Sequence, residues 1–230
     1  MRGDAVQPVR MSDLEYGDLV LSRDRTSGRL VFRPIYLFGH RRPEGRTPYV
    51  HISAAAGGYS LAATRGHFMP VCVGRCSDEE LAAGAAVLEN SNVTPGGSDS
   101  LALSLATVTH VDLASARGAF NPYVRGADLL VDGVLASPHS EWLLDWLAPA
   151  GLVPYLPCIY EALLAPVYGL YGMVGPTVAE WLAHSGLHLA DVGTASEYGI
   201  GYFAVLAGML VPLAAAVTTL RRSPICGWRP

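Results

Sequence analysis

The sequence contains no lysine, so all 16 of its positively charged side chains are arginines, and 20 acidic side chains outnumber them. Charged residues make up only 16% of the chain, whereas hydrophobic residues make up 50%. Because an average soluble domain has about 25% charged residues, this composition favours a buried or membrane-associated chain. The net charge of −4 is not that of a nucleic-acid-binding protein, and we expect no nucleic-acid partner.

Cysteine is scarce as well. The four cysteines, at positions 72, 76, 158 and 226, are too few and too scattered for a disulfide framework, and we expect buried or free thiols. Cys72 and Cys76 have a C-x3-C spacing, but no second Cys/His pair completes a zinc site. The sequence therefore supports neither a metal site nor a cofactor.

The start of the sequence lacks a secretory signal, because residues 1–5 are charged and have no apolar core. Two explanations stay open at this point. Either a signal lies upstream in a longer protein, or the sequence begins part-way through its domain.

The hydrophobic segments of the first part are short and are separated by turn signals. Residues 19–22 and 30–32 flank a polar turn that ends at Gly28, which predicts a hairpin. We expect a polar loop over residues 40–48 because they are rich in Arg, Pro and Gly. Further strands are expected at residues 34–38, 49–53, 59–63, 105–113 and 127–131, with a tight turn at Asp132 and Gly133. This pattern predicts an all-β domain over about residues 1–140.

The last third of the chain changes to apolar, helical patterns. Residues 141–147 look helical, and residues 152–181 are almost entirely apolar but contain four prolines and two glutamates, which predicts short packed or interfacial helices. Residues 198–220 carry no charge and are long enough to cross a bilayer core. Arg221 and Arg222 follow, which favours a cytoplasmic C-terminus if this segment spans. The alternative is a buried helix of a globular tail.

The first candidate catalytic residues are Thr64 and His67, which stand three positions apart at the end of an expected strand. A hydroxyl and an imidazole with this spacing can converge on one peptide bond. The hydroxyl can hydrogen-bond to the backbone, and the imidazole can give a proton to a leaving amide nitrogen near neutral pH. A T-x-x-H spacing also arises by chance in many proteins, so this pair alone does not specify a function.

A second polar group follows a later expected strand, where Ser137, His139 and Ser140 stand close together. A Ser/His hydrolase could be built from such residues. However, the sequence has no G-x-S-x-G elbow, and no acidic residue is placed to orient the histidine. We therefore do not favour a hydrolase.

Three segments, taken in order, resemble hedgehog-type Hint domains, which are similar to inteins. Residues 9–20, V-R-M-S-D-L-E-Y-G-D-L-V, resemble the opening of these domains. Thr64-x-x-His67 resembles their T-x-x-H block. Residues 120–123, F-N-P-Y, together with residues 131–137, V-D-G-V-L-A-S, resemble the closing block.

The resemblance covers about residues 4–147 and implies an all-β horseshoe of short strands with pseudo-twofold symmetry. The implied reaction is autoprocessing, in which a cysteine attacks the preceding peptide carbonyl to form a thioester and a second nucleophile releases the upstream segment. His67 would protonate the leaving nitrogen, and Thr64 would hold or polarise the scissile bond. The implied substrate is the chain's own upstream polypeptide, with a sterol or water as the acceptor.

The sequence departs from the family pattern at three places. The nucleophilic cysteine would stand at or before residue 1, where the sequence has Met1, so the chain as it stands is expected to be inactive. His40 aligns with an aspartate thought to activate the sterol hydroxyl in animal hedgehogs; a histidine can also act as a base, but water is then as good an acceptor candidate as a sterol. Pro138 stands where some animal relatives have a cysteine, which makes the neighbouring His139 a further candidate site residue.

We expect a Hint autoprocessing domain over residues 1–147 and a hydrophobic helical tail over residues 148–230, with a transmembrane helix at residues 198–220. This organisation predicts a membrane protein or a protein of the secretory pathway. Two alternatives to an autoprocessing domain stay open. One is an inactive Hint fold that serves as a membrane-associated binding or structural module, and the other is an unrelated small membrane protein.

Overall fold

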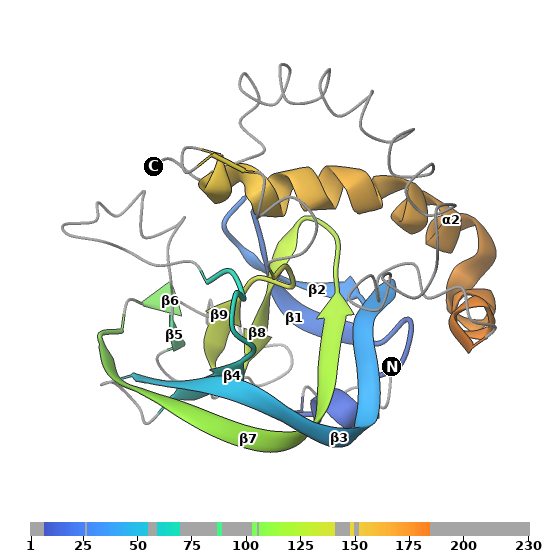
Figure 1. Ribbon diagram of the computed structural model, residues 1–230. Helices are drawn as coiled ribbons and strands as arrows, with labels where there is room; N and C mark the ends of the chain where they lie inside the picture. Colours follow the sequence, from blue (N-terminus) through green and yellow to red (C-terminus); the bar gives the residue numbers. More distant parts are fainter. Residues whose placement is uncertain are drawn as a thin grey trace.

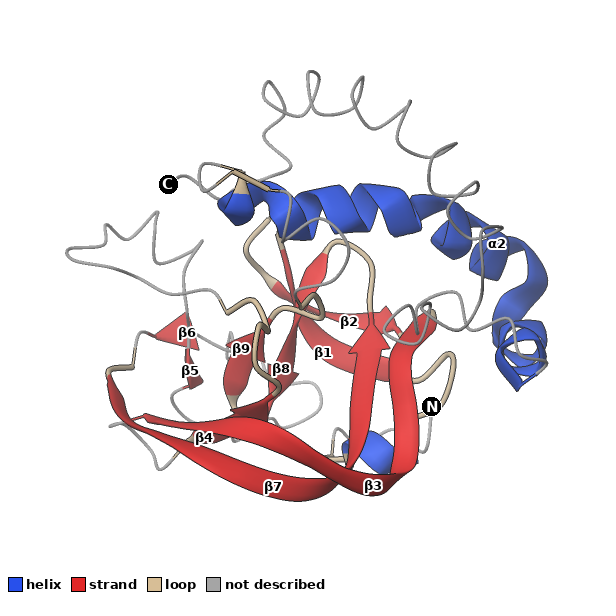
Figure 2. Cartoon of the chain, viewed as in Figure 1, coloured by secondary structure: helices blue, strands red, loops and turns tan. Residues whose placement is uncertain are grey.

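The computed structural model describes residues 7–25, 27–54, 59–69, 87–88, 103–104, 106–140, 148–149 and 152–184. These residues form two antiparallel sheets and one long helix, which confirms the expected mainly β fold with a helical C-terminal part (Figure 1; Figure 2). The helices expected at residues 141–147 and 198–220 lie outside the described residues, as do the cysteines at positions 72, 76 and 226.

Both sheets combine strands that are far apart in the sequence. The first has the strand order β2-β1-β8-β9-β5-β6, and the second has the order β4-β3-β7. In chain order the elements are η1 (Met11–Asp13), β1 (Leu19–Asp24), β2 (Leu30–Pro34), β3 (Leu37–Ala54), β4 (Ser60–Ala63), β5 (Val87–Leu88), β6 (Leu103–Ser104), β7 (Val108–Tyr123), β8 (Ala127–Val131), β9 (Val134–Ala136), η2 (Val153–Tyr155) and α2 (Leu156–His184).

Two predicted turns are confirmed. β1 and β2 pair antiparallel, with Leu21 opposite Phe32, across the turn that Gly28 closes with a φ of +69°. β8 and β9 pair across Asp132 and Gly133, whose φ angles are +49° and +80°. Positive φ at both central residues is the requirement of a type I′ hairpin turn, which Asp-Gly satisfies at low cost.

The loop predicted at residues 40–48 is wrong, because β3 continues through it from Leu37 to Ala54. β3 and β7 pair from Leu37 opposite Tyr123 to Ala54 opposite Val108, and we call this pair the β3–β7 ribbon. The register shifts between Arg42 and Arg46, which is typical of a β-bulge and leaves room for the proline and glycine in between. In Figure 1 the ribbon curves along one side of the molecule.

The core lies at the inner end of this ribbon, which we define as residues 37–40 of β3 and 119–123 of β7. A cluster of buried side chains packs beside it against the N-terminal segment and β8. Its members are Leu14, Ile35, Phe38, Val124 and Leu129. The outer end of the ribbon, residues 42–54 and 108–117, extends away from this core and is largely exposed or half-buried.

α2 consists of two helical segments that meet at a kink, where several short helices were expected. It contains Pro166, and it bends at Gly175, whose φ of +79° and ψ of +175° are not helical. Pro176 follows directly, and a residue before proline is driven out of the α region. The kink therefore ends the first helical segment, and α2 as a whole lies across the sheets in Figure 1.

Buried ion pairs connect α2 to β1 and β8. Arg23 of β1 and the following Arg25 both donate to Asp128 of β8, each with an N–O distance of 2.8 Å. Arg25 also pairs with Glu161 of α2 at 2.7 Å, and Glu161 accepts a hydrogen bond from the main-chain nitrogen of Gly126. Because removing one member of a buried ion pair costs about 3–5 kcal/mol, this network holds the helix at a defined position.

α2 also carries the apolar composition that a membrane helix needs. By length and composition alone, Leu156–Leu182 could cross a membrane. One face of the helix is nevertheless packed on the β sheets, because Leu156, Ile159 and Tyr160 are almost completely buried. Packing of this kind is also found for surface helices of soluble domains, so the helix is only weak evidence of a membrane protein.

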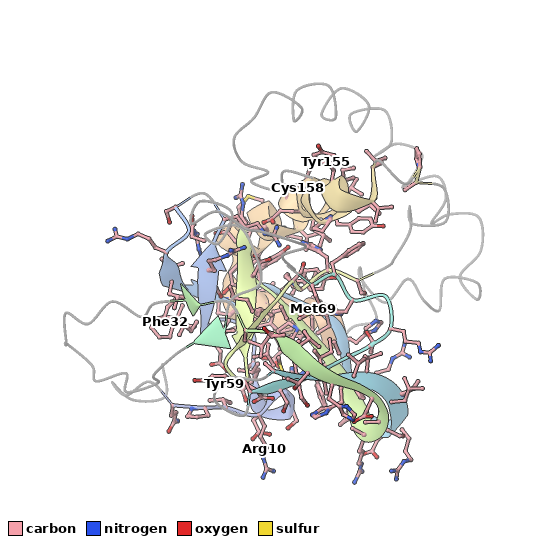
Figure 3. The ribbon with its side chains drawn as sticks, turned by 90° about the vertical axis from the view of Figure 1, so that its left-hand side faces the viewer. Arg10, Phe32, Tyr59, Met69, Tyr155 and Cys158 are labelled. Carbon is pink, nitrogen blue, oxygen red and sulfur yellow. The ribbon has the colours of Figure 1, made fainter. Side chains whose placement is uncertain are left out.

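The start of α2 also corrects the expectation about thiols. Cys158 lies near Tyr155 at this end of the helix (Figure 3). It is disulfide-bonded. The prediction of a buried or free thiol is therefore wrong at this position.

Candidate active site

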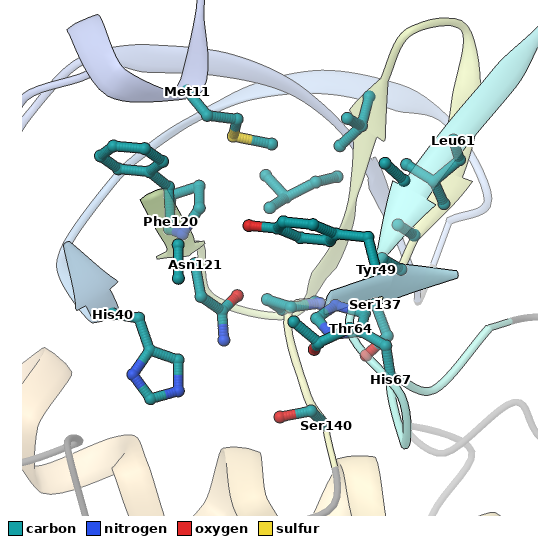
Figure 4. Close-up of a pocket in the computed structure, with 18 residues that line it drawn as sticks. Met11, His40, Tyr49, Leu61, Thr64, His67, Phe120, Asn121, Ser137 and Ser140 are labelled. Atoms are coloured by element: carbon teal, nitrogen blue, oxygen red, sulfur yellow. The ribbon is translucent and has the colours of Figure 1, made fainter. Parts of the chain in front are cut away.

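One pocket at the inner end of the β3–β7 ribbon brings most of the candidate residues together (Figure 4). Thr64 and His67 line it from the segment after β4, and His40 lines it from β3. The N-terminal segment contributes Met11, and the volume of the cavity is about 70 Å³. The other polar side chains of the wall belong to Tyr49, Asn121, Ser137 and Ser140.

A tight turn after β4 positions Thr64 and His67. The main-chain nitrogen of His67 donates to the carbonyl oxygen of Thr64 at 3.2 Å. Gly66 lies between them with a φ of +78°, a conformation that glycine adopts without the steric cost of a side chain. His67 then pairs with Ser140 in an isolated antiparallel bridge. The turn and the bridge together fix the backbone that carries both candidate side chains.

The imidazole of His67 is neutral near pH 7. Burial lowers its pKa below the usual 6.5, hydrogen bonding to the main chain of Ser137 partly offsets this effect, and the charge of His40 adds to it. Among the described residues, the Nδ1 atom of His67 has no hydrogen-bond partner and is shielded from solvent. A neutral imidazole with one nitrogen available can take a proton from one group and pass it to another.

His40 enters the pocket from the side opposite to Thr64, and the amide of Asn121 lies between them (Figure 4). The structure therefore brings Thr64, His67 and His40 to one cavity, as a shared site requires. Whether each of them acts in catalysis stays a prediction.

The fourth candidate, His139, does not line the pocket. Its side chain is buried behind the wall, with its ring edge-to-face against Tyr123 at a centroid distance of 5.3 Å and at 6.1 Å from the ring of Tyr160. Burial lowers its pKa well below 6.5. Its main-chain nitrogen donates to the hydroxyl of Ser137 at 3.1 Å, so His139 contacts the wall of the site but not its interior.

Sequence reasoning placed Asn121 in the closing block but assigned no role to it or to Tyr49, two polar side chains of the wall. The hydroxyl of Tyr49 donates to the carbonyl oxygen of Gly118 at 2.8 Å. Asn121 is 9% exposed and hydrogen-bonds to Tyr123. A Cβ at Gly39 would stand 3.1 Å from the Nδ2 atom of Asn121, so glycine makes room for this amide. An asparagine inside an otherwise apolar strand end was the signal that could have identified it.

The pocket suits a peptide group better than a cofactor. Ligand pockets usually have volumes of about 300–1,000 Å³, well above the 70 Å³ found here. Within the described ranges, no three side chains gather in the way that a metal ion requires. His67 supplies a neutral imidazole and Asn121 a fixed amide donor, and both groups serve acyl-transfer chemistry on a bound carbonyl.

A family model described as the Hint module matches residues 4–192 of the sequence. The chain belongs to the Hint family. The hedgehog-type resemblance is supported by a curated relative, Warthog protein 6 of Caenorhabditis elegans, which is 26% identical over 144 residues. Those residues are 63% of this Hint chain but 23% of the relative, so the chain corresponds to less than a quarter of that protein's length.

Proposed function

We propose that this Hint fold, in a longer form of the chain, cleaves the peptide bond that joins an upstream segment to a cysteine before residue 1. The observation that carries the proposal is that Met11 of the N-terminal segment lines the same cavity as Thr64 and His67. The stretch before Met11 can return to this cavity, because ten residues span up to about 33 Å. The substrate is therefore the chain's own upstream polypeptide.

In the proposed step, one acyl bond replaces another. The cysteine sulfur attacks the preceding carbonyl carbon, a C–S bond forms, the C–N bond breaks, and the thiol proton ends on the released amine. Because His67 is neutral, it can accept the thiol proton and pass it to the leaving nitrogen. Thr64 holds the scissile peptide group. Asn121 donates to the carbonyl oxygen as negative charge develops on it.

We propose water as the acceptor of the second step, with His40 as the base that takes its proton. A cavity of about 70 Å³ has room for water, because about 10–15 Å³ on the same measure holds one molecule. A sterol would need a much larger site. The mass of the released segment decides between them, since water leaves a free carboxylate and a sterol leaves an ester.

The decisive experiment uses a tagged precursor of the full chain with a cysteine placed directly before residue 1. Dithiothreitol, which attacks thioesters, is expected to release the tag at that cysteine. His67→Ala should slow the release at least about tenfold, because general acid–base catalysis contributes about 10²–10⁴-fold. The matched control is His110→Ala, which removes an exposed histidine from the outer end of the ribbon.

The outcomes separate the proposal from its alternative. A precursor that stays intact over about a day at neutral pH, while folded, contradicts autoprocessing and favours an inactive Hint fold that binds or supports a membrane partner. Equal rates for His67→Ala and His110→Ala would remove His67 from the mechanism. The same precursor without the added cysteine is expected to stay intact, as the sequence predicts for this chain as it stands.

We propose a location in the secretory pathway or at a membrane. A disulfide such as that of Cys158 is typical of oxidising compartments, and α2 has the length and composition of a membrane helix. The division into a domain of residues 1–147 and a tail of residues 148–230 stays a prediction from the sequence. Carbonate extraction tests the membrane location. A spanning helix at residues 198–220 would keep the protein in the membrane pellet, whereas a protein that is washed off has no spanning helix.

A further inference from the structure

The first turns of α2 contact the backbone that carries the candidate site. Tyr160 is almost completely buried, and its ring lies 6.1 Å from the ring of His139. On its other side the imidazole of His139 packs against Tyr123 of the inner end of the ribbon. His139 is thus held between the helix and the β sheets, with burial keeping it neutral.

Main-chain hydrogen bonds connect His139 to the turn that carries Thr64 and His67. Its carbonyl oxygen accepts a hydrogen bond of 3.1 Å from the nitrogen of Phe68, the residue after His67. Its nitrogen donates to the hydroxyl of Ser137, whose main chain hydrogen-bonds to the imidazole of His67. Both strands of the His67–Ser140 bridge are therefore tied to His139.

A second contact joins the helix to the same turn directly. The side chain of Phe68 packs against the cluster formed by Leu156, Ile159 and Tyr160. Because Glu161, the next residue of α2, is fixed by its ion pair with Arg25, this cluster sits on a helix that cannot easily shift. In Figure 4 the ribbon of α2 runs along the side of the picture on which Ser140 lies.

We propose that the first turns of α2 form a positioning element of the processing site, in which Tyr160 acts through His139 and Phe68 to hold the imidazole of His67. This inference rests on the proposed autoprocessing function. It assigns to Tyr160 and His139 a positioning role without contact to the reacting atoms. It also makes α2 a required part of the catalytic unit, although the sequence pattern placed it in a separate tail.

The test compares three variants of the cysteine-bearing, full-length precursor. Tyr160→Leu should slow dithiothreitol-induced cleavage at least about tenfold, because a misplacement of about 1 Å can cost about a hundredfold in rate. Tyr160→Phe keeps the ring, so it should cleave faster than Tyr160→Leu. The matched control is Tyr168→Leu, which removes a tyrosine of the same helix that contacts Tyr36 and Arg125 instead of His139.

A second measurement follows the pKa of His67 by NMR in the same proteins and does not depend on cleavage. In the parent and in Tyr168→Leu, burial should keep this pKa below 6.5. In Tyr160→Leu it should rise towards 6.5, because a loosened turn admits water to the imidazole. A parent protein that is folded but does not cleave contradicts the proposed function. Even then, the pKa of His67 in the variants decides whether Tyr160 positions the imidazole.

Two results would overturn the inference. One is an unchanged rate and an unchanged His67 pKa in a folded Tyr160→Leu protein. The other is equal effects of Tyr160→Leu and Tyr168→Leu, which would indicate a general loss of stability. If circular dichroism shows that Tyr160→Leu is unfolded, Tyr160→Met is measured in its place, because it keeps apolar volume but lacks the rigid ring. The same two criteria then apply to it.

Discussion

The inner end of the β3–β7 ribbon is buried and carries polar groups that face a pocket, whereas the outer end, made of the same two strands, is open to solvent. At the inner end Phe38 is 8% exposed and Asn121 is 9% exposed. At the outer end Val111 is 60% and Leu113 is 69% exposed. Strand pairing is therefore common to both ends, but desolvation, which shifts a pKa or strengthens a hydrogen bond, is strongest at the inner end, and at the outer end it raises the pKa of Tyr49, which lines the pocket.

Two of the three register shifts of the ribbon lie at the border between the two ends. The register shifts between Phe38 and Arg41 and again between Arg42 and Arg46. A bulge bends a strand and redirects its side chains. The first shift includes His40, which lines the pocket. The bulges thus allow one pair of strands to serve both a site and an exposed arm.

The largest contrast is expected between the ion pairs of the two regions. Asp128→Ala removes the carboxylate that Arg23 and Arg25 share in the core, and the free energy of unfolding should fall by about 3–5 kcal/mol. Glu44→Ala breaks the exposed pair with Arg117 at the outer end, and the loss should stay below about 1 kcal/mol. Urea unfolding of both variants measures the difference. Similar losses of stability would contradict the conclusion that the buried ion pairs contribute more than the exposed one.

The amide of Asn121 provides the next contrast. Asn121→Ala should slow cleavage of the cysteine-bearing precursor about a hundredfold, which is the effect of removing one donor to a developing oxyanion. Ser115→Ala, at the outer end, removes a polar side chain that contacts Arg46 and should leave the rate unchanged. A single-turnover rate measurement is sufficient, and a loss below about threefold would exclude the amide from the site.

His139 predicts a pH dependence of stability. Burial holds its pKa well below 6.5, the charges of Arg25 and His67 act in the same direction, and Tyr123 and Tyr160 pack around the ring. The unfolded chain therefore binds a proton below pH 6.5 that the folded chain does not, so stability falls as the pH falls through that value. His139→Phe should lose less stability than the parent between about pH 7.5 and about pH 5.5.

Thermal unfolding at several pH values checks this prediction. The effect of one group is at most about 1.4 kcal/mol per pH unit. His110→Phe at the outer end is the control, because His110 is exposed and its replacement should leave the pH dependence of the parent unchanged. Parallel pH curves for the parent and His139→Phe would contradict a neutral, buried imidazole.

The smallest effect is expected at the exposed leucine of the outer end. Leu113→Thr should change the free energy of unfolding by less than about 0.5 kcal/mol, because surface substitutions away from special features rarely do more. Chemical denaturation of the full chain measures this. A loss above about 1 kcal/mol would mean that the outer end is covered by another part of the protein.

The same comparison explains which elements the sequence could predict. The β1–β2 and β8–β9 hairpins were predictable because Gly28, Asp132 and Gly133 supply the positive φ angles that tight turns need. The middle of β3 was not, because residues 42–46 are exposed and therefore show no alternation of burial. The proline and glycine there sit at a bulge, although their composition is typical of a loop.

The candidate site was predictable only in part. Thr64 and His67 belong to a short local motif, so their neighbourhood could be inferred from spacing. His40 was found through the resemblance, but its place opposite Thr64 depends on the pairing of β3 with β7. The burial of His139 against Tyr160 depends on how α2 docks, which no local pattern encodes.

The ion pair between Arg25 and Glu161 affects how the two products of the proposed cleavage would separate. The proposed cleavage ahead of the N-terminal segment would release the upstream segment, while the ion pair keeps the β sheets and α2 of the Hint chain together. An anchor on the C-terminal part would therefore retain the Hint chain, and the upstream segment would be released without that anchor.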